Sequence, residues 1–426
     1  MYKKSIELLK RSEKVIPLGS QTFSKSRLQY PLGHSPLFID HGMGGRVWDV
    51  DGNEYIDLIC GLLPVVLGYL DSDVDKAISK QLKSGITFSL SSELETQLAE
   101  KLVELIPCAE MVRFGKNGTD ATSAAIRLAR AFTGRDHIIA LGYHGWQDWY
   151  IGSTTRNKGV PESVQNLTHK LPFNSIESVE EILAKYKNKV AAIILEPMSF
   201  DEPVPGYLEK LRNISYETGT ILIFDEVITG FRFSIGGAQE YFGVTPDLAT
   251  FGKAMGNGMP ISAVVGRKDI MLEMEEVFYS GTFGGETLSI AAAIAVINKM
   301  ISEPVIETLW KTGKYIALGV QKLILKHGLS DILSLSGKPP LTIIKFNNHI
   351  KADSDAIKTL YMIEMLDQGI LTLGTHNICY AHSNEDILKI INAYDIVLNK
   401  ISIELKTGKL EDRLPVPVIR PIFKVR

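Results

Sequence analysis

The sequence predicts an α/β protein that has a large domain with a mostly parallel sheet covered by helices, plus a smaller α+β domain. Between about residue 90 and residue 225, helical patterns alternate with short apolar runs, which is typical of βαβ units. This alternation ends near Glu303-Pro304. A chain of 426 residues is also too long for one simple core, so two domains are expected.

The predicted elements follow one another along three parts of the chain. The N-terminal segment, residues 1–55, has a helical pattern, Gly/Pro turns and short strands, and we expect it to pack with the small domain. In the large domain, 56–303, the predicted helix–strand pairs are 92–105 with 111–114, 120–133 with 137–141, 177–187 with 190–195, and 207–217 with 220–224. In the small domain, 304–426, we predict helices at 305–327, 354–367 and 384–404, and strands near 341–346 and 370–373.

Composition and charge restrict the function classes. The net charge is -3 and no lysine–arginine stripe is evident, so no nucleic-acid partner is expected. The first residues carry charges throughout and no apolar run is long enough to span a membrane, so neither export nor membrane insertion is expected. The three cysteines form no CxxC or Cys/His metal motif; we expect reduced thiols, no metal and a cytoplasmic protein.

Asp225 and Lys253 each follow a short apolar run, Ile221–Phe224 and Leu248–Gly252 respectively. An open α/β sheet binds its ligands at the ends of such strands, so both side chains are predicted to reach one crevice. An amine and a carboxylate suit pyridoxal 5'-phosphate (PLP): the lysine forms a Schiff base, and the carboxylate keeps the pyridine nitrogen protonated. A structural ion pair is the alternative interpretation of these two residues alone.

The segment Leu222–Glu226 also resembles the Walker B strand of a nucleotide-hydrolysing enzyme. That interpretation requires a GxxxxGK[ST] loop, and no Gly-Lys pair in this chain is followed by serine or threonine. Nucleotide hydrolysis is therefore excluded.

Gly118 and Thr119 open the predicted helix 120–133. The N-terminus of a helix offers backbone N–H groups without helical partners, and here also a hydroxyl, which together suit a phosphate group. An ordinary N-cap is the alternative, and the predicted Schiff-base lysine favours the phosphate.

Several further segments carry a family pattern. In chain order they are Ile16-Pro17, Trp48 to Asn53, Tyr55-Ile56-Asp57, Arg113 to Ala121, Tyr143-His144-Gly145, Glu196-Pro197, Phe224 to Arg232, Gly252-Lys253 and Gly281-Thr282-Phe283. Over roughly residues 15 to 300, this order resembles the class III aminotransferases, the fold-type I PLP-dependent transferases that include glutamate-1-semialdehyde aminomutase.

The resemblance implies roles for several side chains around the cofactor. Lys253 matches the Schiff-base lysine, Tyr143 the aromatic residue on one face of the pyridine ring, and Val227 the residue on the other face. Glu196 matches an active-site glutamate, for which a structural hydrogen bond is the alternative. For His144, a role at the site and simple packing within its loop are equally compatible with the sequence.

Thr282 matches the family threonine that reaches the phosphate of the neighbouring subunit, which implies a homodimer with shared active sites. The chain departs from the aminomutase pattern at Thr22–Lys25, which replaces Ser-Pro-Val-Arg, and at Gly285–Thr287, which replaces Gly-Asn-Pro. Gly369–His382 contains neither the arginine of most aminotransferases nor the glutamate of the aminomutase. These departures favour an unusual amine acceptor, such as a sugar-derived or phosphorylated carbonyl compound.

The predicted function is therefore that of an aminotransferase, which moves an amino group between an amino donor and a small carbonyl substrate. Intramolecular transfer by a glutamate-1-semialdehyde 2,1-aminomutase type of enzyme is the alternative. A PLP-binding protein without turnover is a third, which the presence of Lys253, Asp225 and Thr282 disfavours.

Overall fold

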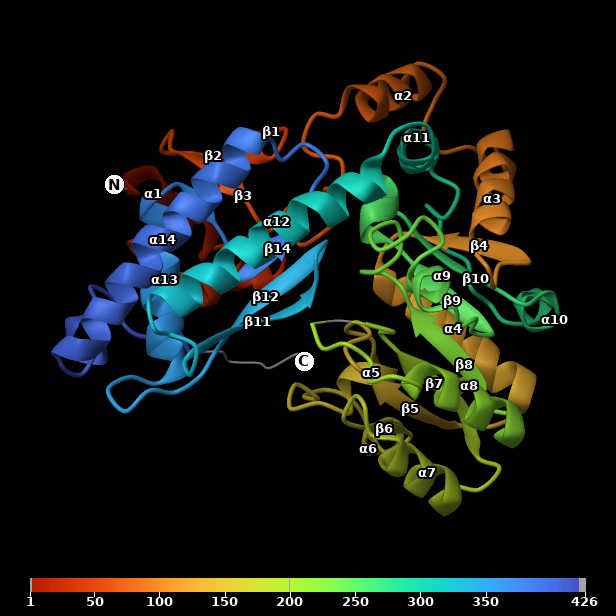
Figure 1. Cartoon of the computed structure of the whole chain (residues 1–426). Helices are drawn as coiled ribbons and strands as arrows, with labels where there is room; N and C mark the ends of the chain where they lie inside the picture. Colours follow the sequence, from red (N-terminus) through yellow and green to blue (C-terminus); the bar gives the residue numbers. More distant parts are fainter. Residues whose placement is uncertain (1, 199, 421–426) are drawn as a thin grey trace. The chain divides into compact units, whose positions relative to one another are not determined.

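The computed structural model describes residues 2–198 and 200–420, which divide into two compact units. Of the described residues, the first unit comprises 2–62, 66–71 and 307–420. The second unit comprises Leu63–Val65 and Ser72–Ile306. Each unit contains its own sheet structure and helices (Figure 1). The domain boundaries inferred from the sequence, at 55/56 and 303/304, stay a prediction.

A seven-stranded sheet forms the centre of the second unit, with the strand order β4-β10-β9-β8-β7-β5-β6. Neighbouring strands from β9 to β6 are parallel, whereas β10 is antiparallel to both β9 and β4. The strands are β4 (Met111–Gly115), β5 (His137–Leu141), β6 (Thr168–Lys170), β7 (Val190–Leu195), β8 (Ile221–Asp225), β9 (Leu248–Phe251) and β10 (Ser262–Gly266). This mostly parallel sheet confirms the predicted fold class.

The described part of the second unit also contains the following helices, several of which pack against its sheet. They are α2 (Ser72–Leu82), α3 (Glu93–Leu105), α4 (Gly118–Thr133), α5 (Asp148–Ile151), α6 (Glu162–Gln165), α7 (Ile176–Lys185), α8 (Tyr207–Thr218), α9 (Ala238–Phe242), α10 (Lys268–Met271) and α11 (Thr287–Ser302). Helix α4 packs across the strands β4, β10, β9, β8 and β7. Its buried face is rich in alanine, which lets the helix approach the sheet closely. All six residues of β7 are buried, as expected of a parallel strand with both faces covered.

The first unit combines segments from both ends of the chain. Its four-stranded sheet has the order β1-β2-β3-β13, and its three-stranded sheet the order β11-β12-β14. The strands are β1 (Ile39–Met43), β2 (Arg46–Asp49), β3 (Glu54–Asp57), β11 (Leu333–Lys338), β12 (Leu341–Phe346), β13 (Ile370–Leu371) and β14 (Thr375–Asn377). The helices are α1 (Lys3–Ser12), α12 (Val305–Lys326), which starts at the boundary of the units, α13 (Ser354–Asp367) and α14 (Asn384–Thr407). The parallel pairing of β3 with β13 joins the N-terminal segment to the C-terminal part.

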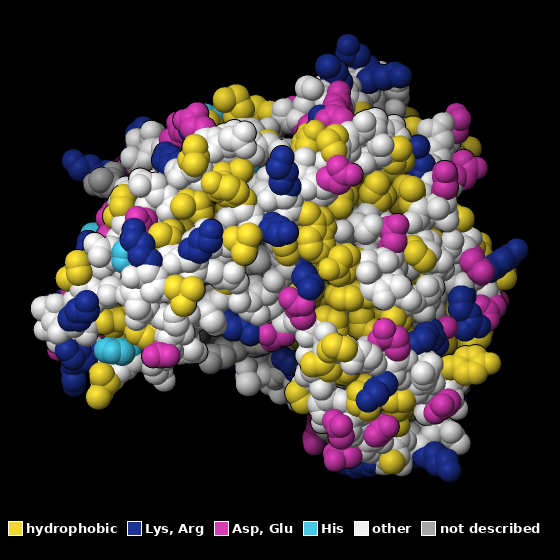
Figure 2. Space-filling model, viewed as in Figure 1, with side chains coloured by type: hydrophobic (Ala, Val, Ile, Leu, Met, Phe, Trp, Pro, Cys, Tyr) yellow, Lys and Arg dark blue, Asp and Glu magenta, His cyan; other side chains and the backbone are white. Residues whose placement is uncertain are grey.

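Charged side chains are mixed on the molecular face that Figure 2 shows, where Lys and Arg alternate with Asp and Glu. Within the described ranges, no single helix has both the length and the apolar composition of a membrane span. The helices α11 and α12 reach that length and composition only when they are counted together, and the chain bends by 74° between them.

Candidate active site

Two neighbouring parallel strands place Asp225 and Lys253 at the same edge of the sheet. Asp225 is the last residue of β8 and pairs in register with Thr250 of β9, so Lys253 follows three residues beyond that partner. The Asp225 carboxylate is buried, with 4% of the residue exposed. Lys253 has a positive φ of 40°, which is costly for a residue with a side chain and is typical of functional sites. The structure therefore places both residues at the ends of adjacent parallel strands, and the shared crevice stays a prediction.

Three groups orient the Asp225 carboxylate. The Nδ1 atom of His144 lies 2.8 Å from Asp225 Oδ2, while the backbone N–H of Val227 and the Thr250 hydroxyl both donate to Oδ1 over 3.2 Å. His144 is buried, and its second ring nitrogen, Nε2, has no hydrogen-bond partner. The sequence left the place of His144 open, and the structure places its ring against Asp225. The hydrogen bond from Thr250 was not predicted, because the pattern of an apolar strand predicts that a threonine within it packs in the core.

Close backbone contacts bring the predicted phosphate residues to the same place. A Cβ atom at Gly118 would lie 2.8 Å from the Val227 side chain, and one at Gly252 would lie 3.5 Å from it. A Cβ atom at Gly145 would lie 2.3 Å from the Thr119 hydroxyl. Val227 therefore lies between the start of α4 and the residue before Lys253, and no side chain larger than glycine fits at Gly118 or Gly145 without rearrangement.

The hydroxyl of Thr119 is buried and has no hydrogen-bond partner. Leaving such a group unsatisfied costs about 1–3 kcal/mol, so a buried hydroxyl without a partner at a helix N-terminus indicates a bound acceptor. Together with the Asp225 carboxylate and the Lys253 amine, this hydroxyl fits the phosphate, pyridine nitrogen and aldehyde of PLP.

Glu196 supports the loop that carries Tyr143. The Tyr143 backbone N–H donates to Glu196 Oε2 over 3.1 Å, and a Cβ atom at Gly142 would lie 2.7 Å from the same oxygen. The Tyr143 ring packs edge-on against Tyr150, with centroids 5.6 Å apart. Glu196 therefore makes a structural hydrogen bond to the Tyr143 loop, which the sequence had left open as its alternative role.

Glu226, next to Asp225, has a different environment. Its carboxylate accepts hydrogen bonds from the backbone of Ala238 and Gln239 and from the Thr229 hydroxyl, over 2.5, 2.9 and 2.6 Å. Complete burial raises the pKa of Glu226 against the effect of these bonds. Glu226 thus fixes α9 to the strand end, whereas Asp225 faces the His144 side.

Thr282 lines a pocket of the second unit. It is exposed, in the turn before α11, and lines a pocket of about 480 Å³ together with Lys116, Arg127 and Gln147. Lys116 forms an ion pair of 3.0 Å with Glu286, the residue that caps α11. The pocket contains cationic side chains, but none of the other predicted site residues lines it.

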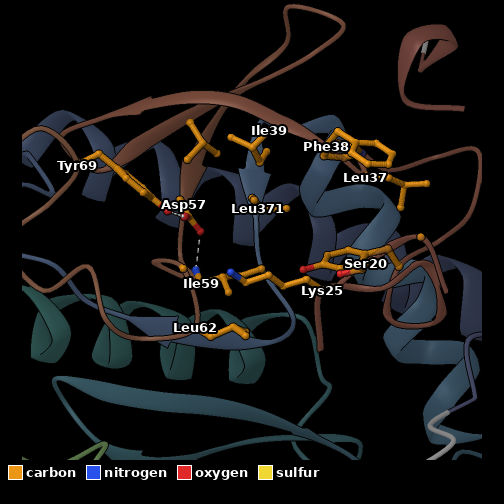
Figure 3. Close-up of a pocket in the computed structure, with 15 residues that line it drawn as sticks. Ser20, Lys25, Leu37, Phe38, Ile39, Asp57, Ile59, Leu62, Tyr69 and Leu371 are labelled. Carbon is orange, nitrogen blue, oxygen red and sulfur yellow. Dashed lines mark hydrogen bonds between the residues drawn. The ribbon is translucent and has the colours of Figure 1, made fainter. Parts of the chain in front are cut away.

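A second pocket, of about 420 Å³, lies within the first unit (Figure 3). Most of its wall is apolar and includes Leu37, Phe38, Ile39, Ile59, Leu62 and Leu371. Lys25, from the stretch that departs from the aminomutase pattern, contributes a cation. Asp57 forms part of the wall, where its carboxylate accepts bonds of 2.7 Å from both the Tyr69 hydroxyl and the Ile59 N–H. This pocket thus combines a mostly apolar wall with one cationic and one acidic side chain.

Comparison with known proteins identifies the family of this chain. Residues 29–388 match the family model described as aminotransferase class-III. The chain is 36% identical to 3-aminobutyryl-CoA aminotransferase of Cloacimonas acidaminovorans, over 92% of this chain and 95% of the relative. It is also 36% identical to glutamate-1-semialdehyde 2,1-aminomutase of Alkaliphilus oremlandii, over 94% of this chain and 99% of that relative. The solved FumI protein of Sphingopyxis sp. MTA144, in its PLP internal aldimine form, superposes with a TM-score of 0.89 at 29% identity, covering 98% of this chain and 99% of that one.

Proposed function

We propose roles for the residues of this site from the family to which the chain belongs. The chain is a class III aminotransferase, a PLP-dependent enzyme that moves an amino group between an amino donor and a carbonyl substrate. Lys253 binds the cofactor covalently and Asp225 pairs with its ring nitrogen. The observation that carries both roles is their position after the adjacent parallel strands β8 and β9. When bound, PLP supplies an electron sink for the bond that breaks at the amine-bearing carbon.

The chain's own groups hold and move the protons. The Asp225 carboxylate holds a proton on the ring nitrogen, and His144 keeps that carboxylate in place through the 2.8 Å bond between its Nδ1 and Oδ2. Lys253, once its amine is released, takes a proton from the amine-bearing carbon and returns it, a general acid–base role. The Thr119 hydroxyl and the Gly118 N–H bind the phosphate, while Tyr143 and Val227 lie on the two ring faces, and Glu196 holds the Tyr143 loop.

We infer that the amine-bearing substrate has no free carboxylate on the reacting carbon. Gly369–His382 contains no arginine, so the usual cation for an α-carboxylate is missing from this stretch. One relative is named for 3-aminobutyryl-CoA, which is a thioester with its amine one carbon further along. A β-amino acyl thioester therefore fits this chain better than an α-amino acid, and an amino sugar remains the competing substrate class.

A half-reaction panel tests this inference. The purified PLP-loaded enzyme is mixed with a 3-aminobutyryl thioester, alanine, glutamate or an amino sugar, and loss of the lysine-bound cofactor's absorbance is followed. The thioester should react fastest. A preference for α-amino acids would contradict the inference, and amino transfer within glutamate-1-semialdehyde without a second substrate would favour the aminomutase alternative.

We also propose a homodimer with shared active sites in the cytoplasm. Beside the exposed Thr282, the second unit exposes two large apolar side chains: Phe278 is 78% exposed and Phe283 58%. Apolar groups that are exposed together in this way mark an interaction surface. Cys60, Cys108 and Cys379 carry thiols rather than disulfides in the structure, which fits a reducing compartment.

A mixed dimer tests the shared site. One chain carries Thr282→Val and its partner Lys253→Ala, so only the first chain can bind PLP covalently. If Thr282 reaches across, that site borrows an intact threonine and binds PLP with native affinity. If it acts within its own chain, the affinity equals that of the Thr282→Val homodimer, which lacks about 1.5–3 kcal/mol per lost charged hydrogen bond.

A further inference from the structure

Two cysteines and a histidine form a buried cluster in the first unit. Cys60 follows β3, whereas Cys379 and His382 follow β14, and the reactive atoms of all three lie within 4.8 Å of one another. The exposed fractions are 0%, 1% and 5%. The cluster therefore joins segments from opposite ends of the sequence.

Backbone groups hold the cluster in place. The Cys60 thiol lies 3.2 Å from the carbonyl oxygen of Asp57 and 3.1 Å from that of Asn377. His382 Nε2 lies 3.2 Å from the same Asp57 carbonyl, and the Cys379 N–H lies 3.1 Å from His382 Nδ1. Cys60 itself has a positive φ of 47°, and Asp57 fixes this conformation by accepting the Cys60 N–H over 3.0 Å.

The environment of Cys379 favours its thiolate form. A hydrogen bond from the Cys60 thiol lowers the pKa of Cys379, and the charge of His382 lowers it further, against the effect of burial. Burial alone would lower the pKa of His382, but the Cys379 sulfur, with Asp386 and the Asp57 carbonyl, raises it to about 9. Asp57 and Tyr69 are the other titratable groups at the cluster.

Cys108 in the second unit offers a contrast. It is buried, its backbone N–H bonds to Gln239, and burial raises the pKa of its thiol. It does not belong to the group of Cys60, Cys379 and His382. Cys108 is therefore the internal control for the reactivity of the pair.

We propose that Cys60 and Cys379 are a reversible thiol pair that hydrogen peroxide oxidises to a disulfide, with His382 as the proton acceptor. The Cys379 thiolate attacks one peroxide oxygen; a sulfur–oxygen bond forms, the oxygen–oxygen bond breaks, and the hydroxide leaves as water after taking the proton from His382. The Cys60 thiol then attacks the Cys379 sulfur, and a second water leaves. Two thiols thus lose two electrons, and one peroxide becomes two waters.

Two further observations concern the surroundings of the cluster and its capacity to bind a metal. The unit's pocket is lined by Asp57, Ile59 and Gly61, which flank Cys60 in the sequence. The cluster provides three ligand atoms among the described residues, whereas a structural zinc site takes four. A bound metal is therefore an outcome of the test and not the proposal.

The test uses the full-length PLP-loaded enzyme. It is treated with hydrogen peroxide, quenched with catalase, unfolded and alkylated with N-ethylmaleimide, and its intact mass and linked peptides are measured. The expected result is one alkylated cysteine, Cys108, a peptide pair that links Cys60 with Cys379, and three alkylated cysteines after dithiothreitol. Three alkylated cysteines without reduction, added oxygen without linked peptides, or one tightly bound metal ion per chain would each overturn the proposal.

Variants separate the roles. Cys108→Ser should keep the linkage, whereas Cys60→Ser and Cys379→Ser should each abolish it. His382→Gln should slow the oxidation about tenfold, because less thiolate is present. The matched control is His376→Gln, another buried histidine of the same unit, which is bonded to Thr342 and Tyr394 and should leave the rate unchanged. An unchanged rate in His382→Gln would remove the histidine from the proposal, and the wild-type linkage test stands even if that variant does not fold.

Discussion

Two buried histidines show how differently the two units use their polar groups. In the second unit, His144 bonds to Asp225 through Nδ1, and its Nε2 has no partner. In the first unit, His376 has both ring nitrogens bonded, to the Thr342 hydroxyl over 2.7 Å and to the Tyr394 hydroxyl over 2.6 Å. The fully bonded histidine stabilises its fold. The half-bonded one, near the unpartnered Thr119 hydroxyl, lies where a ligand completes the structure.

The largest expected effect comes from Lys253→Ala in the second unit. Removal of the amine eliminates both the covalent attachment of PLP and the proton transfer, so kcat should fall by at least about 10⁴-fold. The visible band of the lysine-bound cofactor should disappear while circular dichroism stays that of the wild type. Lys268→Ala, an exposed lysine at the start of α10, is the control and should change neither property. Retention of the band in Lys253→Ala would show that PLP is attached to a different lysine.

Asp225→Asn and Glu226→Gln compare two adjacent buried acids. The amide at position 225 cannot hold the ring proton, so kcat should fall by about 10²–10⁴-fold while PLP stays bound. At position 226, the amide weakens the bonds to Ala238 and Gln239 and should cost about 1–3 kcal/mol of unfolding free energy, with kcat almost unchanged. Stopped-flow half-reactions and thermal melts measure the two effects. Equal kinetic losses in both variants would contradict the division of roles.

Thr119→Val tests the hydroxyl that lacks a partner. If it binds the phosphate, PLP affinity should fall by about 1.5–3 kcal/mol, or roughly 10–150-fold in Kd. The control, Thr220→Val, removes a buried hydroxyl that lies 3.4 Å from the Val190 carbonyl at the opposite end of β8. That variant should lose stability and keep its PLP affinity. Titration of the apoenzymes with PLP decides the matter, and an unchanged Kd in Thr119→Val would show that the hydroxyl does not contact the phosphate.

The smallest effect concerns acid stability of the first unit. Burial lowers the pKa of His376 from 6.5 to about 4, so the folded state binds the proton less readily than the unfolded chain. The contribution of the neutral, buried His376 to the free energy of unfolding is complete above pH 6.5, and it is lost as the pH falls toward 4. Between pH 7.5 and 5.5 the loss should be about 1 kcal/mol. His376→Gln should lower the melting temperature and flatten this dependence in thermal melts. An equal pH slope in the variant would show that other groups cause it.

The sequence predicts where Asp225, Lys253, Gly118 and Thr119 lie in the fold, because each is directly beside an element that is recognisable from its own residues. Apolar runs mark the ends of β8 and β9, and the helical pattern marks the start of α4. The antiparallel strand β10 was not predicted, because its short run Ser262–Gly266 gains its role only from pairing with β4 and β9. The side-chain roles themselves stay predictions.

The first unit's polar groups were not predicted from the sequence. Cys379 and His382 are three residues apart, but the third member, Cys60, comes from the other end of the chain. The pairing of β3 with β13 brings these ends together, and nothing in either local pattern specifies that pairing. The sequence around His376 does not predict its hydrogen bonds, because their partners Thr342 and Tyr394 come from distant segments of the chain. Contacts between distant segments thus account for most of what was missed.

The covalent attachment of PLP to Lys253 is the central claim, and one measurement tests it directly. The purified wild-type enzyme is reduced with borohydride, which fixes the cofactor to its lysine, and is then digested and mapped by mass spectrometry. The phosphopyridoxyl group should appear on the peptide that contains Lys253 and on no other. Its appearance on a different lysine, or its absence from a PLP-loaded preparation, would contradict the assignment of this site.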